Sequence, residues 1–143
     1  MISKQAARDA FSKAARNYDA SAVLQREIGG RMLERLDYIR LQPKMILDAG
    51  AGTGEASAAL MKRYPRSRVV ALDFALPMLQ RARRRGHWLR RPLPLCADAE
   101  HLPLADASCD LVFSSLTLQW CNDLPQLFQE LLRVLRPGGL LMF

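Results

Sequence analysis

Apolar residues recur along this chain in two alternating patterns. The segments 6–17 and 23–36 carry them at helical spacing, and the second segment ends before Pro43. Short apolar runs then alternate with helix-compatible segments, the runs at 45–49, 68–72, 92–96, 109–115 and 140–143 and the helices at 55–64, 77–85 and 124–135. Pro137-Gly138-Gly139 is expected to form a turn before the last run. This alternation predicts a parallel sheet covered by helices, with a ligand beside the carboxyl ends of the first and fourth strands.

Residues 46–54 read Ile-Leu-Asp-Ala-Gly-Ala-Gly-Thr-Gly and join the first predicted strand to its helix. Glycine lacks a Cβ, so the backbone can turn sharply there and a ligand can approach closely. A dinucleotide fingerprint needs its third glycine at position 55 or 57, which hold Glu55 and Ser57. The spacing excludes that fingerprint and leaves Asp-x-Gly-x-Gly-x-Gly, led by Asp48. A turn without a ligand is the weaker interpretation, because three glycines follow an acidic residue.

This glycine pattern resembles motif I of the class I S-adenosylmethionine (SAM) methyltransferases. The resemblance implies an α/β fold with a Rossmann-like, mostly parallel sheet, truncated after its fifth strand because that family has seven. It implies a single SAM-binding domain over residues 1–143, with a helical cap at 1–40, a Rossmann-like core at 44–143 and the last strands absent. It also implies SAM as the cofactor.

Acidic residues near the predicted strand ends extend this candidate site. Asp73 ends the second strand, where a carboxylate accepts hydrogen bonds from ribose hydroxyls in comparable folds, although it could instead cap the next helix. Asp98 can accept a hydrogen bond from an adenine amino group, and Ala99 can offer a backbone N–H. Asp106 and Asp110 are expected in turns. Phe74 and Met78 can pack on the adenine, with the core as the alternative for Met78. The predicted cofactor-binding residues are Asp48, Gly50, Gly52, Gly54, Asp73, Phe74, Met78, Asp98, Ala99 and Ser114.

A narrower resemblance rests on the opening Lys4-Gln5-Ala6-Ala7-x-x-Ala10-Phe11-x-x-Ala14-Ala15-x-x-Tyr18 and on Gln119-Trp120-Cys121. These segments resemble the malonyl-acyl-carrier-protein O-methyltransferase family of biotin synthesis. The resemblance implies methylation of the free malonyl carboxylate on an acyl-carrier protein. A carboxylate is ionised at neutral pH, so no catalytic acid or base is assigned. Tyr18, Gln119 and Trp120 are candidates for orienting the substrate, and core packing remains equally open for Trp120.

Composition narrows the possible compartments and partners. The 143 residues suit one domain, and no apolar run approaches the ~20 residues that span a membrane. Three widely spaced cysteines indicate reduced thiols in a cytoplasmic protein, and two scattered histidines indicate no metal site. The net charge of +7 favours an acidic partner or a nucleic acid. A basic run is predicted to form a solvated face, with carrier-protein docking as the second interpretation; it consists of Arg81, Arg83, Arg84, Arg85, Arg90 and Arg91. The docking candidates are Arg81, Arg83, Arg84 and Arg85.

Other functions remain open beside the leading hypothesis. The missing strands would be consistent with an inactive SAM-binding fragment or an assembly factor. Another class I methyltransferase acting on a protein, an RNA or a small molecule is a further alternative. A nucleic-acid substrate is the weaker of these alternatives. The segment 114–120 lacks the Asn/Asp-Pro-Pro-Tyr-like loop of adenine-methylating enzymes. Cytosine-C5 methyltransferases use a Pro-Cys nucleophile, and no cysteine in this chain follows a proline.

Overall fold

The computed structural model describes residues 3–14, 23–52, 54–84, 90–115 and 121–143. Its helices and strands, in chain order, are α1 (Lys4–Ala14), α3 (Val23–Arg35), the 3-10 turn η1 (Leu36–Tyr38), β1 (Met45–Ala49), α4 (Glu55–Arg63), β2 (Arg68–Asp73), α5 (Leu76–Arg83), β3 (Leu93–Cys96), β4 (Cys109–Phe113), α6 (Leu124–Val134) and β5 (Leu135–Met142). Within these ranges, none of the helices is long and apolar enough to cross a membrane.

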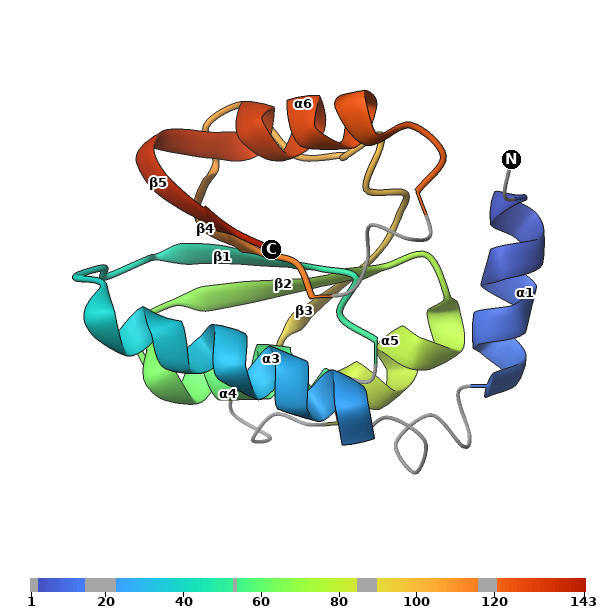
Figure 1. The fold of residues 1–143 in the computed structure, drawn as a ribbon, viewed down its shortest axis with the longest axis horizontal. Helices are drawn as coiled ribbons and strands as arrows, with labels where there is room; N and C mark the ends of the chain where they lie inside the picture. The colour runs from blue at the N-terminus through green and yellow to red at the C-terminus, as the bar shows by residue number, and fades with distance from the viewer. Residues whose placement is uncertain (1–2, 15–22, 53, 85–89, 116–120) are drawn as a thin grey trace.

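The five strands form one parallel sheet in the order β3-β2-β1-β4-β5. β1 lies at the centre, and the chain proceeds first to one side of it and then to the other, which creates a switch point between β1 and β4. Helix α6 covers one face of the sheet, while α3, α4 and α5 cover the other (Figure 1). The predicted parallel α/β sheet is therefore confirmed.

Alternate residues of the central strands supply two apolar layers. Leu47 of β1 and Val112 of β4 face α6 and pack with its buried Leu127 and Leu131. The intervening strand residues face the opposite layer, which includes Ile46, Leu111, Phe113, Leu60 and Met32. Because side chains alternate between the faces of a strand, the short apolar runs fill both layers at once.

The start of β5 differs from the prediction of a strand at 140–143. Cys109 pairs with Leu135, yet Leu111 pairs with Leu140, so β5 carries extra residues opposite β4. Gly138 has a φ of 81° there. The predicted turn is therefore wrong: Pro137, Gly138 and Gly139 form a bulge inside β5, which pairs with β4 on both sides of them.

Two charged residues expected in solvent-facing roles support the fold instead. Asp110, expected in a turn, lies in β4 and accepts hydrogen bonds from the N–H groups of Lys44 and Met45 at 2.8 and 2.9 Å. Arg90, expected on a solvated basic face, donates to the carbonyl oxygens of Met61, Tyr64 and Ser67 at 2.5, 2.9 and 2.7 Å. Asp110 thus fixes the start of β1, and Arg90 fixes the connection between α4 and β2.

Candidate functional site

A tight glycine turn forms the floor of the candidate site at the carboxyl end of β1. Gly50 and Gly52 have φ angles of 79° and 56°, a region that side-chain-bearing residues rarely adopt. The N–H groups of Gly50 and Ala51 both donate to the carbonyl oxygen of Leu72 at 2.8 Å. These hydrogen bonds connect the turn to the end of β2, so the carboxyl ends of β1 and β2 are held in a fixed position relative to each other.

Gly54 serves a packing role at the start of α4. A Cβ at this position would lie 2.6 Å from the Cα of Ala82, and the residue has a φ of 88°. The third glycine of the motif therefore lets α4 and α5 approach closely. Its predicted contact with a cofactor stays a prediction, because this packing alone accounts for the absence of a side chain.

Asp73 joins the end of β2 to the glycine turn. Its carboxylate accepts hydrogen bonds from Gly52 N–H at 2.9 Å and from Ala75 N–H at 3.0 Å, and the residue is 7% exposed. Burial raises the pKa of Asp73, while the backbone hydrogen bonds from Ala75, Gly52 and Phe74 oppose that rise. Since a carboxylate has about four acceptor positions, Asp73 keeps about one for a hydroxyl group of a ligand.

Asp48 lies beneath the glycine turn. It is 2% exposed, and the Ser57 hydroxyl donates a 2.6 Å hydrogen bond to it. Burial raises the pKa of Asp48 to about 7; the Ser57 hydrogen bond opposes the rise and the charge of Asp73 adds to it. This geometry makes Asp48 a support that links β1 to α4, since it is not among the residues that line the cavity described below.

Asp98 and Glu100 follow β3 and lie under the N-terminal helix α1. The Lys4 ammonium contacts both carboxylates, at 2.5 Å from Asp98 Oδ2, and Glu100 is 3% exposed. Glu100 also accepts the N–H of Asp123 at 2.6 Å, just before α6. The loop after β3 is therefore held from two sides, by α1 and by the start of α6.

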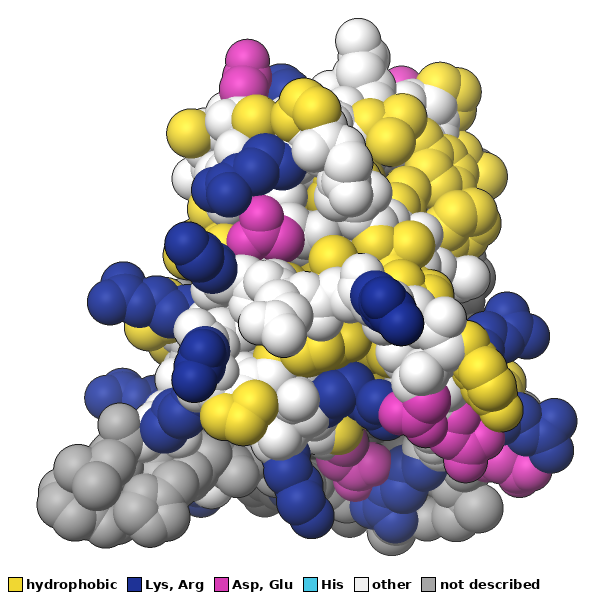
Figure 2. Space-filling view, turned by 90° about the vertical axis from the view of Figure 1, so that its left-hand side faces the viewer, with side chains coloured by type: hydrophobic (Ala, Val, Ile, Leu, Met, Phe, Trp, Pro, Cys, Tyr) yellow, Lys and Arg dark blue, Asp and Glu magenta, His cyan; other side chains and the backbone are white. Residues whose placement is uncertain are grey.

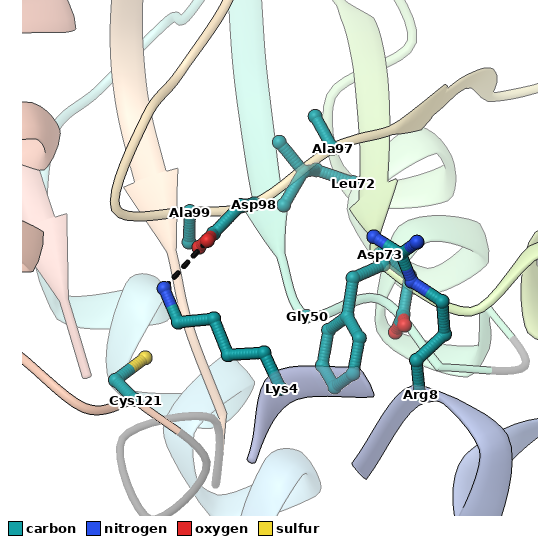
Figure 3. Close-up of a pocket in the computed structure, with 10 residues that line it drawn as sticks. Lys4, Arg8, Gly50, Leu72, Asp73, Ala97, Asp98, Ala99 and Cys121 are labelled. Atoms are coloured by element: carbon teal, nitrogen blue, oxygen red, sulfur yellow. Dashed lines mark hydrogen bonds and ion pairs between the residues drawn. The ribbon is translucent and has the colours of Figure 1, made fainter. Parts of the chain in front are cut away.

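These segments enclose a cavity at the carboxyl edge of the sheet (Figure 3). Its volume is about 40 Å³, enough for a few water molecules. The lining residues are Lys4, Arg8, Gly50, Leu72, Asp73, Phe74, Ala97, Asp98, Ala99 and Cys121.

The cavity brings together half of the predicted cofactor-binding residues: Gly50, Asp73, Phe74, Asp98 and Ala99. Met78 is fully buried in the core, the alternative named for it. Ser114 is 2% exposed, and its hydroxyl has no hydrogen-bond partner among the described residues. An unpaired buried hydroxyl is costly, so Ser114 keeps its place as a candidate for binding a ligand.

Some candidates cannot be placed, and others were missed. Tyr18, Gln119, Trp120 and Arg85 lie outside the described residues. The cationic pair Lys4 and Arg8, for which no site role was predicted, lies one helical turn apart on α1 and lines the cavity. Their spacing shows that they share a helix face, but not that this face covers the sheet edge. Within the described part of the chain, no cluster of side chains could hold a metal ion.

Comparisons with known proteins identify relatives for this architecture. A family model described as a methyltransferase domain matches residues 47–143. The chain is 56% identical to a malonyl-[acyl-carrier protein] O-methyltransferase of Gallionella capsiferriformans, with 100% of this chain and 51% of that protein covered. It is 54% identical to the protein of that name from Xylella fastidiosa, with 94% and 46% covered. The chain thus spans about half the length of these relatives.

A solved structure shares the fold. A Methanococcus maripaludis protein described as an S-adenosyl-L-methionine-dependent methyltransferase superposes with a TM-score of 0.79 at 26% identity, over 90% of this chain and 60% of that one. The match agrees with the strand order and helix layers described above.

Proposed function

Because this chain belongs to the methyltransferase-domain family, we propose that its cavity binds SAM. In this proposal, the backbone of the turn at Gly50 and Gly52 contacts the methionine portion. Asp73 accepts a ribose hydroxyl, and Asp98 with the Ala99 N–H recognises the adenine. The protein of known structure with the same fold is described as SAM-dependent, which supports this assignment.

The observation that carries the proposal is the direct link between the glycine turn and Asp73. The Gly52 N–H donates to Asp73 at 2.9 Å, so the backbone that would approach the ligand and the carboxylate that would bind it are positioned together. Asp98 supplies a second acceptor on the same cavity wall. Two acceptors beside a close-approach backbone suit an adenosyl group, which offers ribose hydroxyls and an exocyclic amine as donors.

We further propose that the acceptor is the free carboxylate of a malonyl group carried by an acyl-carrier protein, in the synthesis of biotin precursors. The names of the relatives at 56% and 54% identity support this substrate. Because these relatives are about twice as long as the chain, their activity is carried over here as a proposal. Tyr18, Gln119 and Trp120 remain the candidates for orienting the malonyl group.

The chemistry places modest demands on the side chains. SAM would supply a methyl group on a sulfonium, and a malonyl carboxylate oxygen would bond to that carbon as the carbon–sulfur bond breaks, without a proton transfer. A carboxylate is already ionised at neutral pH. The chain's contribution is therefore to align the two groups and to exclude water. Helix α1, which lies over the cavity, is suited to the second task (Figure 3).

A two-step assay tests the proposal. Calorimetry of the purified protein with SAM should show one binding site, and transfer of labelled methyl groups to malonyl-acyl-carrier protein should follow. Binding without transfer would favour a SAM-binding role and reject the proposed acceptor. Absence of binding to folded protein would reject the cofactor assignment. Unmodified carrier protein serves as the control, because it lacks the malonyl carboxylate.

A further inference from the structure

Helix α1 reaches the candidate base-binding loop through one side chain. Lys4 extends from the first turn of α1 towards Asp98, as the dashed line in Figure 3 marks. The two residues are 94 positions apart in the sequence. The contact is long-range and connects the N-terminal helix to the loop that follows β3.

The Lys4 ammonium is shared by two carboxylates of unequal burial. Glu100 is 3% exposed, whereas the side chain of Asp98 is 33% exposed. A buried carboxylate requires a compensating partner, and two adjacent carboxylates repel one another. One ammonium between them compensates for the burial of Glu100 and draws Asp98 into a fixed position.

The hydrogen bonds of Asp98 leave room for a ligand. Oδ1 accepts the Glu100 N–H at 2.9 Å, and Oδ2 accepts from Lys4 at 2.5 Å. Each carboxylate oxygen can accept about two hydrogen bonds. Counting the described partners, both oxygens therefore keep an acceptor position while the side chain is held at both ends. Asp98 is thus held in one orientation while its carboxylate can still accept further hydrogen bonds.

We propose that Lys4 is a positioning residue for base recognition. Its ammonium holds Asp98 in the orientation that accepts a hydrogen bond from the exocyclic amino group of an adenine. The position of α1 and recognition of the base are thereby coupled through one ion-pair cluster, Lys4–Asp98–Glu100. This inference rests on the proposed function, since it takes an adenosyl compound as the ligand.

A ligand that lacks the amino group separates this role from a structural one. S-Adenosylhomocysteine carries the amino group, and S-inosylhomocysteine carries an oxygen in its place. Lys4→Met should lower the affinity for the adenosyl compound about tenfold, the loss expected for one charge-assisted hydrogen bond. Affinity for the inosyl compound should change by less than about twofold. Calorimetry of both ligands gives the two ratios.

Three further variants complete the test. Lys4→Arg keeps the positive charge and should restore preference for the adenosyl compound. Lys4→Met combined with Asp98→Asn should lose no more affinity than Asp98→Asn alone, because both changes remove the same interaction. Lys62→Met, an exposed lysine of α4 outside the cavity lining, should behave like the wild type.

Several outcomes would overturn the inference. Equal losses for both ligands in Lys4→Met would show that Lys4 only holds α1 in place. Unchanged affinity for the adenosyl compound would show that Asp98 needs no positioning. If the wild-type protein binds neither ligand, the cofactor assignment fails first and the inference fails with it. Circular dichroism on each variant confirms that the comparison is made between folded proteins.

Discussion

At the scale of single residues, Asp73 connects the backbone of the site to its ligand. It is 7% exposed, and its carboxylate accepts the backbone N–H groups of Gly52 and Ala75 among others. Asp73→Asn keeps the size of the side chain but replaces one acceptor oxygen with a donor. We expect SAM affinity to fall by ~1–3 kcal/mol, as for a buried hydrogen-bonding group that loses its partner.

Calorimetric titration of wild type and Asp73→Asn with SAM measures this loss. Asp106→Asn is the matched control, because the Asp106 side chain is 80% exposed and lies outside the cavity lining. An unchanged affinity in Asp73→Asn would remove Asp73 from the ribose site and would leave it the purely structural role of fixing Gly52 and Ala75.

Asp48 makes the stability of the fold depend on pH. Its pKa rises from 3.8 to about 7 on folding, chiefly through burial. Between these values the folded protein holds a proton that the unfolded chain has released, so the free energy of unfolding falls as pH rises. The slope from this one group is at most about 1.4 kcal/mol per pH unit. Its stabilising effect is complete below pH 4 and lost above pH 7.

Asp48→Asn removes this titration while its side-chain oxygen can still accept the Ser57 hydroxyl. We expect the wild type to lose more stability between pH 5 and pH 8 than the variant does, as measured by urea denaturation. Asp73, whose pKa is also raised, contributes a slope of the same sign in both proteins. Identical pH dependence in wild type and variant would contradict the assignment.

At the scale of secondary-structure elements, the close approach of α4 to α5 depends on Gly54. A Cβ there would meet the backbone of Ala82 at 2.6 Å, which cannot move aside cheaply. We expect Gly54→Ala to lower the free energy of unfolding by about 1–3 kcal/mol. Gly30→Ala provides the contrast, because no atom lies within 4 Å of its would-be Cβ. This helical substitution should raise stability by about 0.5–1 kcal/mol. Thermal or urea unfolding distinguishes the two, and equal effects would refute the packing role.

The sequence identified the elements more reliably than their ends. Alternating apolar runs located all five strands, because a buried strand such as β1 needs little besides consecutive apolar residues. The start of β5 was misjudged, because Pro137 and two glycines indicate a turn and do not show that strand pairing continues on both sides of it. The structural role of Arg90 was not predicted, because Arg90 donates to backbone carbonyl groups. Every residue has such a group, so no residue type in the sequence indicates these contacts.

At the scale of the whole molecule, the sheet order explains which site residues could be predicted. The glycine turn, Asp73 and Asp98 follow adjacent strands, so parallel topology alone places them at one edge. The position of α1 depends instead on contacts such as Lys4 with Asp98, across 94 residues. Periodicity reports which residues share a helix face but not which distant segment that face meets. The sequence pattern therefore could not predict that α1 lies over the site.

The positive charge is also a property of the whole molecule. Lys and Arg side chains, with acidic residues among them, gather over the side where β1 begins, opposite α1 (Figures 1 and 2). Exposed Arg66 and Arg68 lie at the start of β2. Arg83 and Arg84, at the end of α5, are exposed as well, and α5 packs against α1. The net charge of +7 is therefore spread over several surfaces, and only a comparison between surfaces can identify a docking site.

We expect the proposed carrier-protein docking to depend on α5. Arg83→Glu combined with Arg84→Glu should raise the KM for malonyl-acyl-carrier protein several-fold, because charge reversal at an interface rim slows association with an acidic partner. SAM affinity should not change. Arg66→Glu with Arg68→Glu reverses the same charge at the start of β2, outside α5, and should leave KM unchanged. Added salt should shrink the difference between wild type and the α5 variant, since exposed charges are screened. Equal effects of both double reversals would indicate general attraction by the net charge, and α5 would then have no special role in docking.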